Sequence, residues 1–207
     1  MRTRRSVPVV LIISGPSGGG KTTVCERLLA SSSKLSRVIT CTTRPPRGGE
    51  RDGVDYYFLD EAGFRRRLDQ NEFLEHANVH GHLYGTLKEE LRRILSTGRD
   101  VLMNVDVQGA ETVRRIAPTV PEIGDSLVSV FLTPGDLAVL RERLERRGKD
   151  SPEIIARRLA AAREEIAQWE HFDYLVMSTT ADEDLRRMQV IYEAEQMRVS
   201  RASSPDL

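Results

Sequence analysis

The sequence predicts an α/β fold in which helices cover both faces of a parallel β-sheet. Two observations predict it: strand-length runs that are almost entirely apolar, and helical patterns between most of them. Near-continuous apolar runs indicate strands that are buried on both faces, as they are in parallel sheets. The five runs are residues 7–14, 37–43, 100–106, 127–132 and 174–178.

The helical patterns follow the strand runs in the order that a parallel sheet requires. Residues 22–31 follow the first run, residues 107–117 the third, and residues 136–147 the fourth. We therefore expect the sheet and its helices, the core, to comprise residues 1–40, 98–141 and 168–200. Residues 201–207, at the polar end of the chain, are predicted to be a disordered tail.

Two segments interrupt this alternation. Residues 41–97 are polar and rich in turn-forming residues, with an alternating stretch "DYYFLD" and two short helical patterns, 61–70 and 86–98. This segment predicts an inserted α+β lobe. Residues 142–167 form the second interruption, where Ser151, Pro152 and Glu153 are typical of a helix start and apolar residues then recur at helical spacing.

The charges balance, with 31 basic and 31 acidic side chains among 207 residues. Long-range attraction to nucleic acid or to an anionic membrane is therefore not expected, and no obligate protein partner is inferred. The longest apolar run is too short to span a bilayer, and the start of the chain does not read as a signal peptide. Two cysteines are too few for a disulfide framework. Together these features predict a cytoplasmic protein.

The first sign of chemistry is "GPSGGGKT", which matches the phosphate-binding pattern G-x-x-x-x-G-K-[ST], the P-loop. It follows a buried strand and opens a helix, as the pattern requires. Glycine backbone N–H groups and a helix N-terminus attract phosphate, and Lys21 would reach the β- and γ-phosphates. The alternative is a tight turn that binds nothing. The residues predicted to bind ATP are Gly15, Pro16, Ser17, Gly18, Gly19, Gly20, Lys21, Thr22 and Thr23.

A magnesium ion would complete such a site. The hydroxyl of Thr22 and an acidic side chain at the end of a neighbouring strand are the expected ligands, directly or through water. Asp106 ends the run 100–106 and is the best candidate. It could instead cap the helix that follows, and both roles are compatible.

A second anion site is indicated by "TTRPPRGGE". Arg44 and Arg47 flank a stiff Pro-Pro corner and could give bidentate hydrogen bonds to a phosphate. Tyr56 and Tyr84 could add hydroxyl donors. Such residues are usually ordinary surface arginines and core tyrosines, but a phosphoryl donor upstream implies an acceptor.

At this point the sequence resembles guanylate kinases over nearly its whole length. The segments "ISGPSGGGKTT", "TTRPPRGGERDGVDYYF", "NEFLEHANVHGHLYGT", "VDVQGA" and "RRLAAAREE" occur in the order seen in that family. The resemblance implies a P-loop NTPase core, a GMP-binding lobe at 41–97 and a helical lid at 142–167. It also implies Mg²⁺-dependent transfer of the ATP γ-phosphoryl group to GMP, and plausibly to dGMP, in purine nucleotide metabolism.

The resemblance also assigns roles to residues. Its implied catalytic residues are Lys21, Arg44, Arg147 and Arg158, the last two being lid arginines. Its implied GMP-binding residues are Thr40, Arg44, Arg47, Tyr56, Glu75, Tyr84, Thr86, Asn104 and Asp106.

The chemistry of guanine supports the base-reading assignment independently. A carboxylate such as Glu75 can accept from both N1–H and N2–H₂ of guanine, whereas adenine presents a bare lone pair there. Thr86 can donate to guanine O6, where adenine has an amino group. A site built this way discriminates on the order of 10⁴-fold or more, because the wrong base leaves buried polar groups unpaired.

Three positions depart from the family pattern. Thr40 stands where serine is frequent, Asn104 where an acidic residue is usual, and Ser178 where an asparagine often meets the adenine. Asn104 removes a charge near the metal and acceptor, and Ser178 makes selectivity for the donor base less secure than selectivity for GMP.

Two other functions stay open at this stage. Guanylate-kinase-like domains that bind phosphorylated partners without chemistry typically have a damaged phosphate loop, and Lys21 and Thr22 are intact here. A kinase for another small phosphate ester would have no base edge for Glu75 and Thr86 to read.

Overall fold

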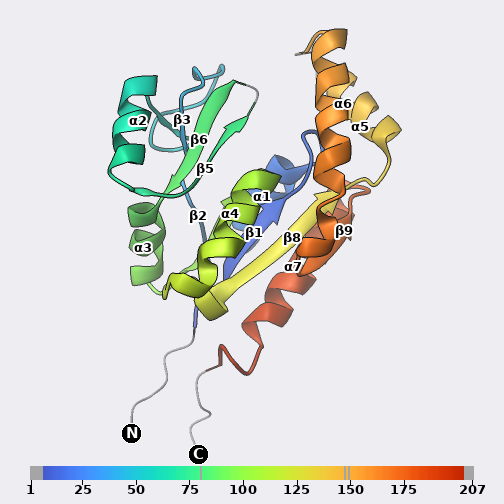
Figure 1. Ribbon diagram of the computed structural model, residues 1–207. Coiled ribbons are helices and arrows are strands. Elements are labelled where there is room, and N and C mark those ends of the chain that lie inside the picture. Colours follow the sequence, from blue (N-terminus) through green and yellow to red (C-terminus); the bar gives the residue numbers. More distant parts are fainter. Residues whose placement is uncertain (1–6, 80, 147, 149, 203–207) are drawn as a thin grey trace, which may run out of the picture.

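The computed structural model describes residues 7–79, 81–146, 148 and 150–202. In this part of the chain, five parallel strands form a central sheet in the order β2-β7-β1-β8-β9 (Figure 1). The α/β fold class with a parallel sheet is therefore confirmed. The five strands are β1 (Val10–Ser14), β2 (Leu35–Arg37), β7 (Asp100–Asn104), β8 (Leu127–Thr133) and β9 (Tyr174–Met177).

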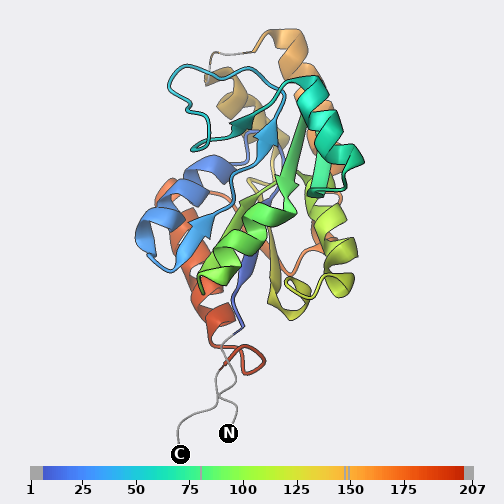
Figure 2. The same ribbon diagram turned by 90° about the vertical axis from the view of Figure 1, so that its left-hand side faces the viewer.

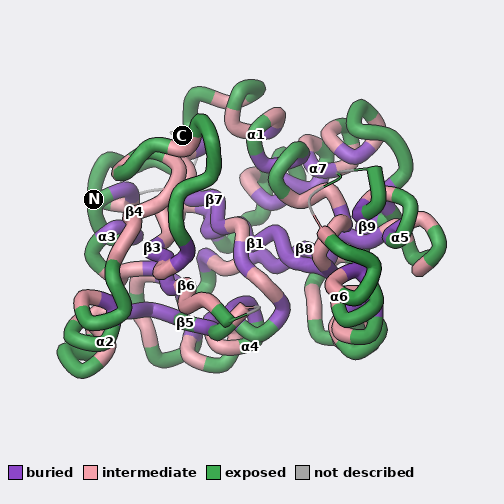
Figure 3. Tube along the Cα trace, turned by 90° about the horizontal axis from the view of Figure 1, so that it is seen from above, coloured by how far each residue is buried: buried purple, intermediate pink, exposed green. Residues whose placement is uncertain are grey.

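Helices cover both faces of this sheet because successive side chains of its strands point to opposite sides. In β1, Leu11 and Ile13 pack against α1 (Lys21–Ser31) and α7 (Ala181–Gln196). Val10 and Ile12 pack against α3 (Lys88–Ser96) and α4 (Val107–Ile116). Seen from above, the buried residues concentrate in β7, β1 and β8 (Figure 3). Burial on both faces is thus confirmed for the runs that form β1, β7 and β8, whereas in β9, at the edge of the sheet, Leu175 and Met177 are exposed.

The run 37–43 was predicted as one strand of the central sheet, and that prediction is wrong. β2 ends at Arg37, and the chain then leaves the central sheet and enters a second one at β3 (Cys41–Thr42). The backbone hydrogen bonds show the exchange: Val38 N–H donates to Leu102 of β7, whereas Thr43 N–H donates to Leu83 of the lobe. An apolar run indicates burial, but it does not say in which sheet.

The inserted lobe has a four-stranded sheet in the order β4-β3-β6-β5 within the described residues. Phe64 of α2 stacks on Phe73 of β5, with their ring centroids 4.4 Å apart, and both pack beside Cys41. The helix α3 was assigned to the lobe from sequence, but Leu91 and Ile94 pack into the core of the central sheet. The lobe elements are β4 (Tyr57–Phe58), α2 (Glu61–Asp69), β5 (Phe73–Val79) and β6 (His82–Leu87).

Two helices, α5 (Leu137–Arg146) and α6 (Pro152–Ile166), stand above the end of the sheet, across from the lobe (Figure 1). Ser151 caps α6 by accepting from the Ile154 N–H, and Pro152 occupies the first turn, as predicted. An apolar cluster that includes Leu140, Leu144, Ile155 and Leu159 joins the two helices. We call this pair the α5–α6 unit.

The end of the chain differs from the prediction of a tail that is disordered from residue 201. The Arg201 side chain is 2% exposed and pairs with Glu195, and the Arg201 carbonyl accepts from the Val7 N–H. Figure 2 shows the start of β1 and the end of α7 at the same end of the molecule. Residues 203–207 of the predicted tail lie outside the described residues. In the described part of the chain, no helix has both the length and the apolar character needed to cross a membrane.

Candidate active site

The phosphate loop joins β1 to α1 in a conformation that glycine permits. Gly15 has φ 139°, and a Cβ there would collide with the carbonyl oxygen of Leu132 in β8. Gly20 precedes α1 in the left-handed region, with φ 101°. The N-cap residue Gly20 has no side chain to cap this end of α1, and the first helical residues, Lys21 and Thr22, line a cavity.

Lys21 folds back over this loop. Its Nζ donates to the carbonyl oxygens of Gly15, at 2.6 Å, and Pro16, at 3.0 Å. The ammonium group is thereby held against the backbone of the loop. Lys21 and Thr22 border a cavity of about 230 Å³, which we call the central cleft.

The central cleft brings most of the predicted site residues together, from elements far apart in the sequence. The predicted residues that line it are Gly15, Ser17, Lys21, Thr22, Thr40, Arg47, Tyr56, Glu75, Tyr84, Asn104, Asp106 and Arg158. Arg37 and Glu165 also line it and were not predicted. Arg37 ends β2, and Glu165 lies in the last turn of α6.

Glu75 lines the cleft and forms a cross-strand pair of β5 and β6 with Thr86. Thr86 Oγ1 donates to Glu75 Oε1 at 2.6 Å, and the two residues are 4% and 1% exposed. Burial, with a smaller contribution from the nearby Asp106 charge, raises the pKa of the Glu75 carboxyl from 4.5 to about 7, although the Thr86 hydrogen bond lowers it. The pair is thus a buried polar surface whose protonation changes near neutral pH.

Asp106 begins α4 at the edge of the central sheet. Its Oδ1 accepts from the Gly109 N–H at 2.6 Å, so the expected capping role is confirmed. The same side chain borders the cleft with Lys21 and Thr22. A Cβ at position 109 would stand 2.7 Å from Glu75 Oε2, so glycine there lets the lobe approach this helix closely.

The two arginines of the Pro-Pro corner have different surroundings. Arg47 lines the central cleft. Arg44 is 8% exposed, lies 5.4 Å from the centre of the Tyr56 ring, and is not among the described lining residues. Its Nη2 donates to both carboxylate oxygens of Glu50 at 2.9 Å. Since Glu50 also accepts from the Arg47 N–H, this carboxylate holds the corner together.

Arg158 reaches the phosphate loop from α6. Its Nη1 lies 3.4 Å from Ser17 Oγ and 3.2 Å from Asp150 Oδ2. Burial raises the pKa of Glu165, on the same helix, although the Lys21 charge and the Ser17 backbone N–H lower it. Arg147, the other predicted lid arginine, lies outside the described residues.

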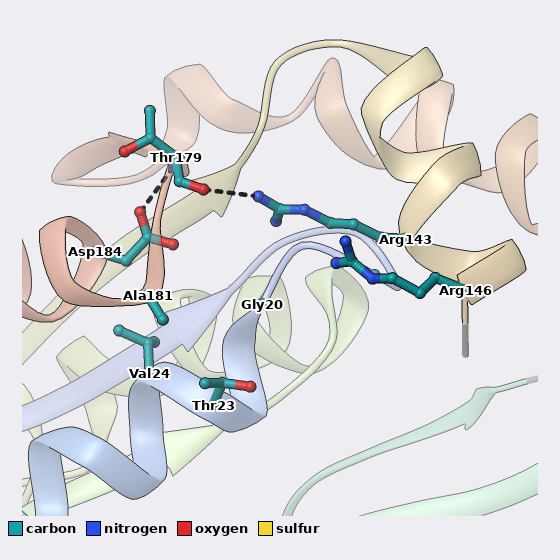
Figure 4. Close-up of a pocket in the computed structure, with 9 residues that line it drawn as sticks. Gly20, Thr23, Val24, Arg143, Arg146, Thr179, Ala181 and Asp184 are labelled. Carbon is teal, nitrogen blue, oxygen red and sulfur yellow. Dashed lines mark hydrogen bonds between the residues drawn. The ribbon is translucent and has the colours of Figure 1, made fainter.

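A second cavity of about 310 Å³ lies on the other side of the phosphate loop (Figure 4). Of the predicted residues, Gly18, Gly20 and Thr23 line this outer pocket. Arg143 crosses its wall and donates to Ser178 Oγ at 3.0 Å and to the Thr179 carbonyl at 3.2 Å. Pro16, Gly19 and Thr86 are not among the described residues that line either cavity.

Ser178 is part of a closed network in this wall. Its hydroxyl donates to Asp184 Oδ2 at 2.6 Å, and Asp184 Oδ1 accepts from the Thr179 N–H. The Thr179–Asp184 bond is drawn in Figure 4. Ser178, which departs from the family pattern, therefore joins Arg143 to Asp184 in this wall.

Comparisons with known proteins agree with this geometry. The family model described as guanylate kinase matches residues 7–195. A guanylate kinase of Nitrosomonas europaea is 40% identical over 93% of this chain and 92% of its own length. One of Novosphingobium aromaticivorans is 42% identical over 93% of this chain and 85% of its own.

A solved structure agrees as well. The crystal structure of guanylate kinase from Anaplasma phagocytophilum superposes with a TM-score of 0.76 at 31% identity, over 97% of this chain and 92% of that one. Sequence, site geometry and fold point the same way. The chain belongs to the guanylate kinase family.

Proposed function

We propose that this chain is a guanylate kinase that transfers the γ-phosphoryl group of ATP to GMP, and to dGMP, and forms ADP and GDP reversibly. One observation supports this most strongly: the phosphate loop with its lysine lines the same cleft as the buried Glu75, which accepts a hydrogen bond from Thr86. A donor phosphate and an acceptor base would therefore be held by opposite walls. Such a reaction serves purine nucleotide metabolism and GMP recycling, in the cytoplasm predicted from the composition.

The acceptor base would be read by Glu75 and Thr86. The Glu75 carboxylate would accept from guanine N1–H and N2–H₂. The Thr86 hydroxyl has one hydrogen, which it gives to Glu75 in this structure. On GMP binding this hydrogen would turn toward guanine O6, and the guanine donors would replace it on Glu75. Thr40 lines the same cleft.

The acceptor phosphate would be held by Arg47, Tyr56 and Tyr84. The two tyrosines line the cleft, and their rings meet edge to face with centroids 6.2 Å apart. Arg44 stands behind Tyr56, and its bond to Glu50 would open to give a second guanidinium.

The donor would lie along the phosphate loop, with its base in the outer pocket and the Arg143 and Arg146 guanidinium groups beside it. Thr22 and Asp106 both line the cleft, and hydroxyl and carboxylate oxygens are hard ligands that fit Mg²⁺. The ion, when bound, would neutralise charge on the donor phosphates. Lys21 would hold the β- and γ-phosphates in line with the acceptor.

Arg158, and Arg147 with it, would stabilise the charge that spreads over the transferred phosphoryl group. Such arginines can contribute ~10³ or more in rate. Because Arg158 is bound to Ser17 and Asp150 here, the α5–α6 unit would have to close over the donor to bring it into place. Closure would also exclude water, which limits hydrolysis of ATP.

The alternative of an inactive module that binds phosphorylated partners is less well supported. A module of that kind has no need of Lys21 held against the backbone of a phosphate loop. A kinase for another phosphate ester is disfavoured by the buried Glu75–Thr86 pair, which would then have no base edge to read.

The variant Lys21→Ala tests the proposal. We expect a turnover loss of at least about 10³-fold, because the lysine stabilises the charge of the transferring group, with an unchanged far-UV circular dichroism spectrum and melting temperature. The readout is ADP release in a coupled assay with ATP, Mg²⁺ and GMP. Full activity of this variant would remove the phosphate loop from the reaction.

A further inference from the structure

Arg37 ends β2 in the central sheet, and its side chain reaches the inserted lobe. Its Nη2 donates to the carbonyl oxygen of Asp55 at 2.8 Å. Its guanidinium carbon lies 5.8 Å from the centre of the Tyr56 ring, within the ~6 Å over which a cation is attracted to an aromatic face. Arg37 therefore contacts the turn that carries Tyr56, one of the residues proposed to hold the acceptor phosphate.

The turn that Arg37 contacts is compact. The Asp55 N–H donates to the Arg51 carbonyl, and the Gly53 N–H donates to the Tyr56 carbonyl. The Asp55 carboxylate accepts from the Arg51 N–H within the turn. The Arg37 bond goes to the Asp55 carbonyl instead, so it places Arg37 beside Tyr56 without neutralising the charge of the arginine.

Arg37 borders two cavities at once. One is the central cleft, and the other is a cavity of about 330 Å³ that is lined by residues of α1 and of the Pro-Pro corner. Arg47 and Tyr56 also line both cavities. The Arg37 side chain thus shares its open surroundings with two residues that are proposed to bind the acceptor phosphate.

The charge of Arg37 distinguishes it from two other arginines of the site. Arg44 pairs with Glu50 at 2.9 Å, and Arg158 pairs with Asp150 at 3.2 Å. Among the described residues no carboxylate pairs with Arg37, whose hydrogen bond goes to a neutral carbonyl. A guanidinium carries five N–H donors in a planar fork that matches the oxygens of a phosphate. The Nε and Nη1 donors of Arg37 can therefore serve an anion in the cleft.

We propose that Arg37 is a further binding residue for the acceptor phosphate, contributed by the central sheet. Its Nη2 would stay on the Asp55 carbonyl while Nε and Nη1 donate to the GMP phosphate beside Arg47 and Tyr56. Because Arg37 belongs to the central sheet and the other two residues to the lobe, one phosphate would hold the lobe against the sheet. This inference rests on the acceptor site proposed above.

The variants Arg37→Gln, Arg37→Lys and Arg99→Gln test it. Glutamine removes the charge but can still donate to the Asp55 carbonyl, whereas lysine keeps the charge. Arg99 is the matched control, because its Nη2 donates to the Ser33 and Leu35 carbonyls at the start of β2. Calorimetry with GMP alone measures acceptor affinity without turnover. At about 0.05 M salt we expect Arg37→Gln to bind GMP at least about fivefold more weakly than the wild type, Arg37→Lys within about threefold and Arg99→Gln within about twofold.

Salt separates a contact between charges from a tether that supports the turn. At about 0.5 M salt the attraction between guanidinium and phosphate is screened, so the difference between wild type and Arg37→Gln should shrink by at least about twofold. A difference that does not change with salt would mean that Arg37 only supports the turn, and would overturn the proposal. Binding by Arg37→Lys as weak as that by Arg37→Gln would also contradict it.

The donor side supplies the second measurement. The β,γ-imido analogue of ATP, titrated with Mg²⁺, should bind each variant as it binds the wild type, which shows that each variant is folded and that the effect belongs to the acceptor. Weaker analogue binding by Arg37→Gln would overturn the assignment to the acceptor. GMP affinity of Arg37→Gln equal to that of the wild type overturns the role of Arg37 while leaving the acceptor site in place. A wild type that does not bind GMP at all overturns the proposed acceptor site, and this inference with it.

Discussion

At the scale of single residues, Glu75 is a buried carboxyl with a proposed role in reading the acceptor base. Its carboxylate is buried with a threonine hydroxyl as partner, and burial raises its pKa to about 7. Guanine would supply two further N–H donors, which favour the charged form. The site thus carries an unfavourable charge until the proposed acceptor arrives.

This predicts a pH dependence of GMP binding. Because GMP needs the charged carboxylate, we expect the dissociation constant to rise by up to about tenfold per pH unit as the pH falls below about 7. Calorimetric titrations of wild type and Glu75→Gln with GMP across this range make the comparison. Protonation of the GMP phosphate affects both proteins, so the difference reports Glu75. Parallel profiles for the two proteins would contradict the role of Glu75.

The same residue predicts an effect on stability in the absence of nucleotide. A carboxyl with a raised pKa holds its proton more tightly in the folded state, so stability falls as pH rises from about 4.5 to about 7 and stays lower above that. At pH of about 8, Glu75→Gln should therefore increase the free energy of unfolding by about 1–3 kcal/mol. Urea unfolding at several pH values measures this. A Glu75→Gln variant less stable than the wild type at that pH would refute it.

At the scale of elements, the phosphate loop depends on its close contact with β8. Gly15 has positive φ and no space for a Cβ beside Leu132. Gly15→Ala should move the loop, weaken binding of the ATP analogue by at least about tenfold and cost about 1–3 kcal/mol of stability. Gly48→Ala is the control, since a Cβ there meets no atom within 4 Å. Unaltered analogue binding by Gly15→Ala would show that the loop tolerates the shift.

Helices, strands and turns could be predicted from sequence where adjacent residues alone determine them. The apolar run of β1, the glycine loop and the Ser151 cap of α6 each follow from adjacent residues. The division of the run 37–43 between two sheets did not, because it depends on pairing with β7 and β6. Nor did the hairpin of β5 and β6, whose Glu75 and Asn78 make the segment look like a polar loop.

At the scale of the whole molecule, residues near Arg201 bind α7, β9 and the start of the described chain. Glu195 of α7 is 1% exposed and is bound by Arg201, by Arg198 and by the Tyr174 hydroxyl of β9. The Arg201 carbonyl also takes the Val7 N–H, which joins the two ends of the described chain. This polar cluster lies away from the cleft.

Arg201→Ala should therefore lower stability without changing catalysis. It removes one buried partner of Glu195 while two remain, so we expect a loss of about 1–3 kcal/mol, less than the cost of an unpaired buried charge. Arg198→Ala removes an exposed partner and should cost less than about 1 kcal/mol. Thermal unfolding and turnover at 25 °C measure both effects. Equal melting temperatures of Arg201→Ala and wild type would show that the cluster is not needed.

Site residues were predictable from sequence only when they lay in a recognisable motif. The phosphate loop and the Glu75 and Thr86 segments carry their chemistry in short stretches. Glu165 and Arg37 reach the cleft because α6 and β2 end beside it, and spacing along the chain does not reveal which helix face or strand end meets a loop. Arg44 has several acidic residues near it in the sequence, and its pairing with Glu50 is determined by the fold.

The central claim is that one cleft holds a donor phosphate and reads a guanine monophosphate. ADP release measured with ATP, Mg²⁺ and each of GMP, AMP, CMP and UMP tests it most directly. The account predicts rapid release with GMP and kcat/KM values lower by on the order of 10⁴-fold for the other three, because their bases leave Glu75 and Thr86 unpaired. Equal rates with GMP and AMP would contradict it.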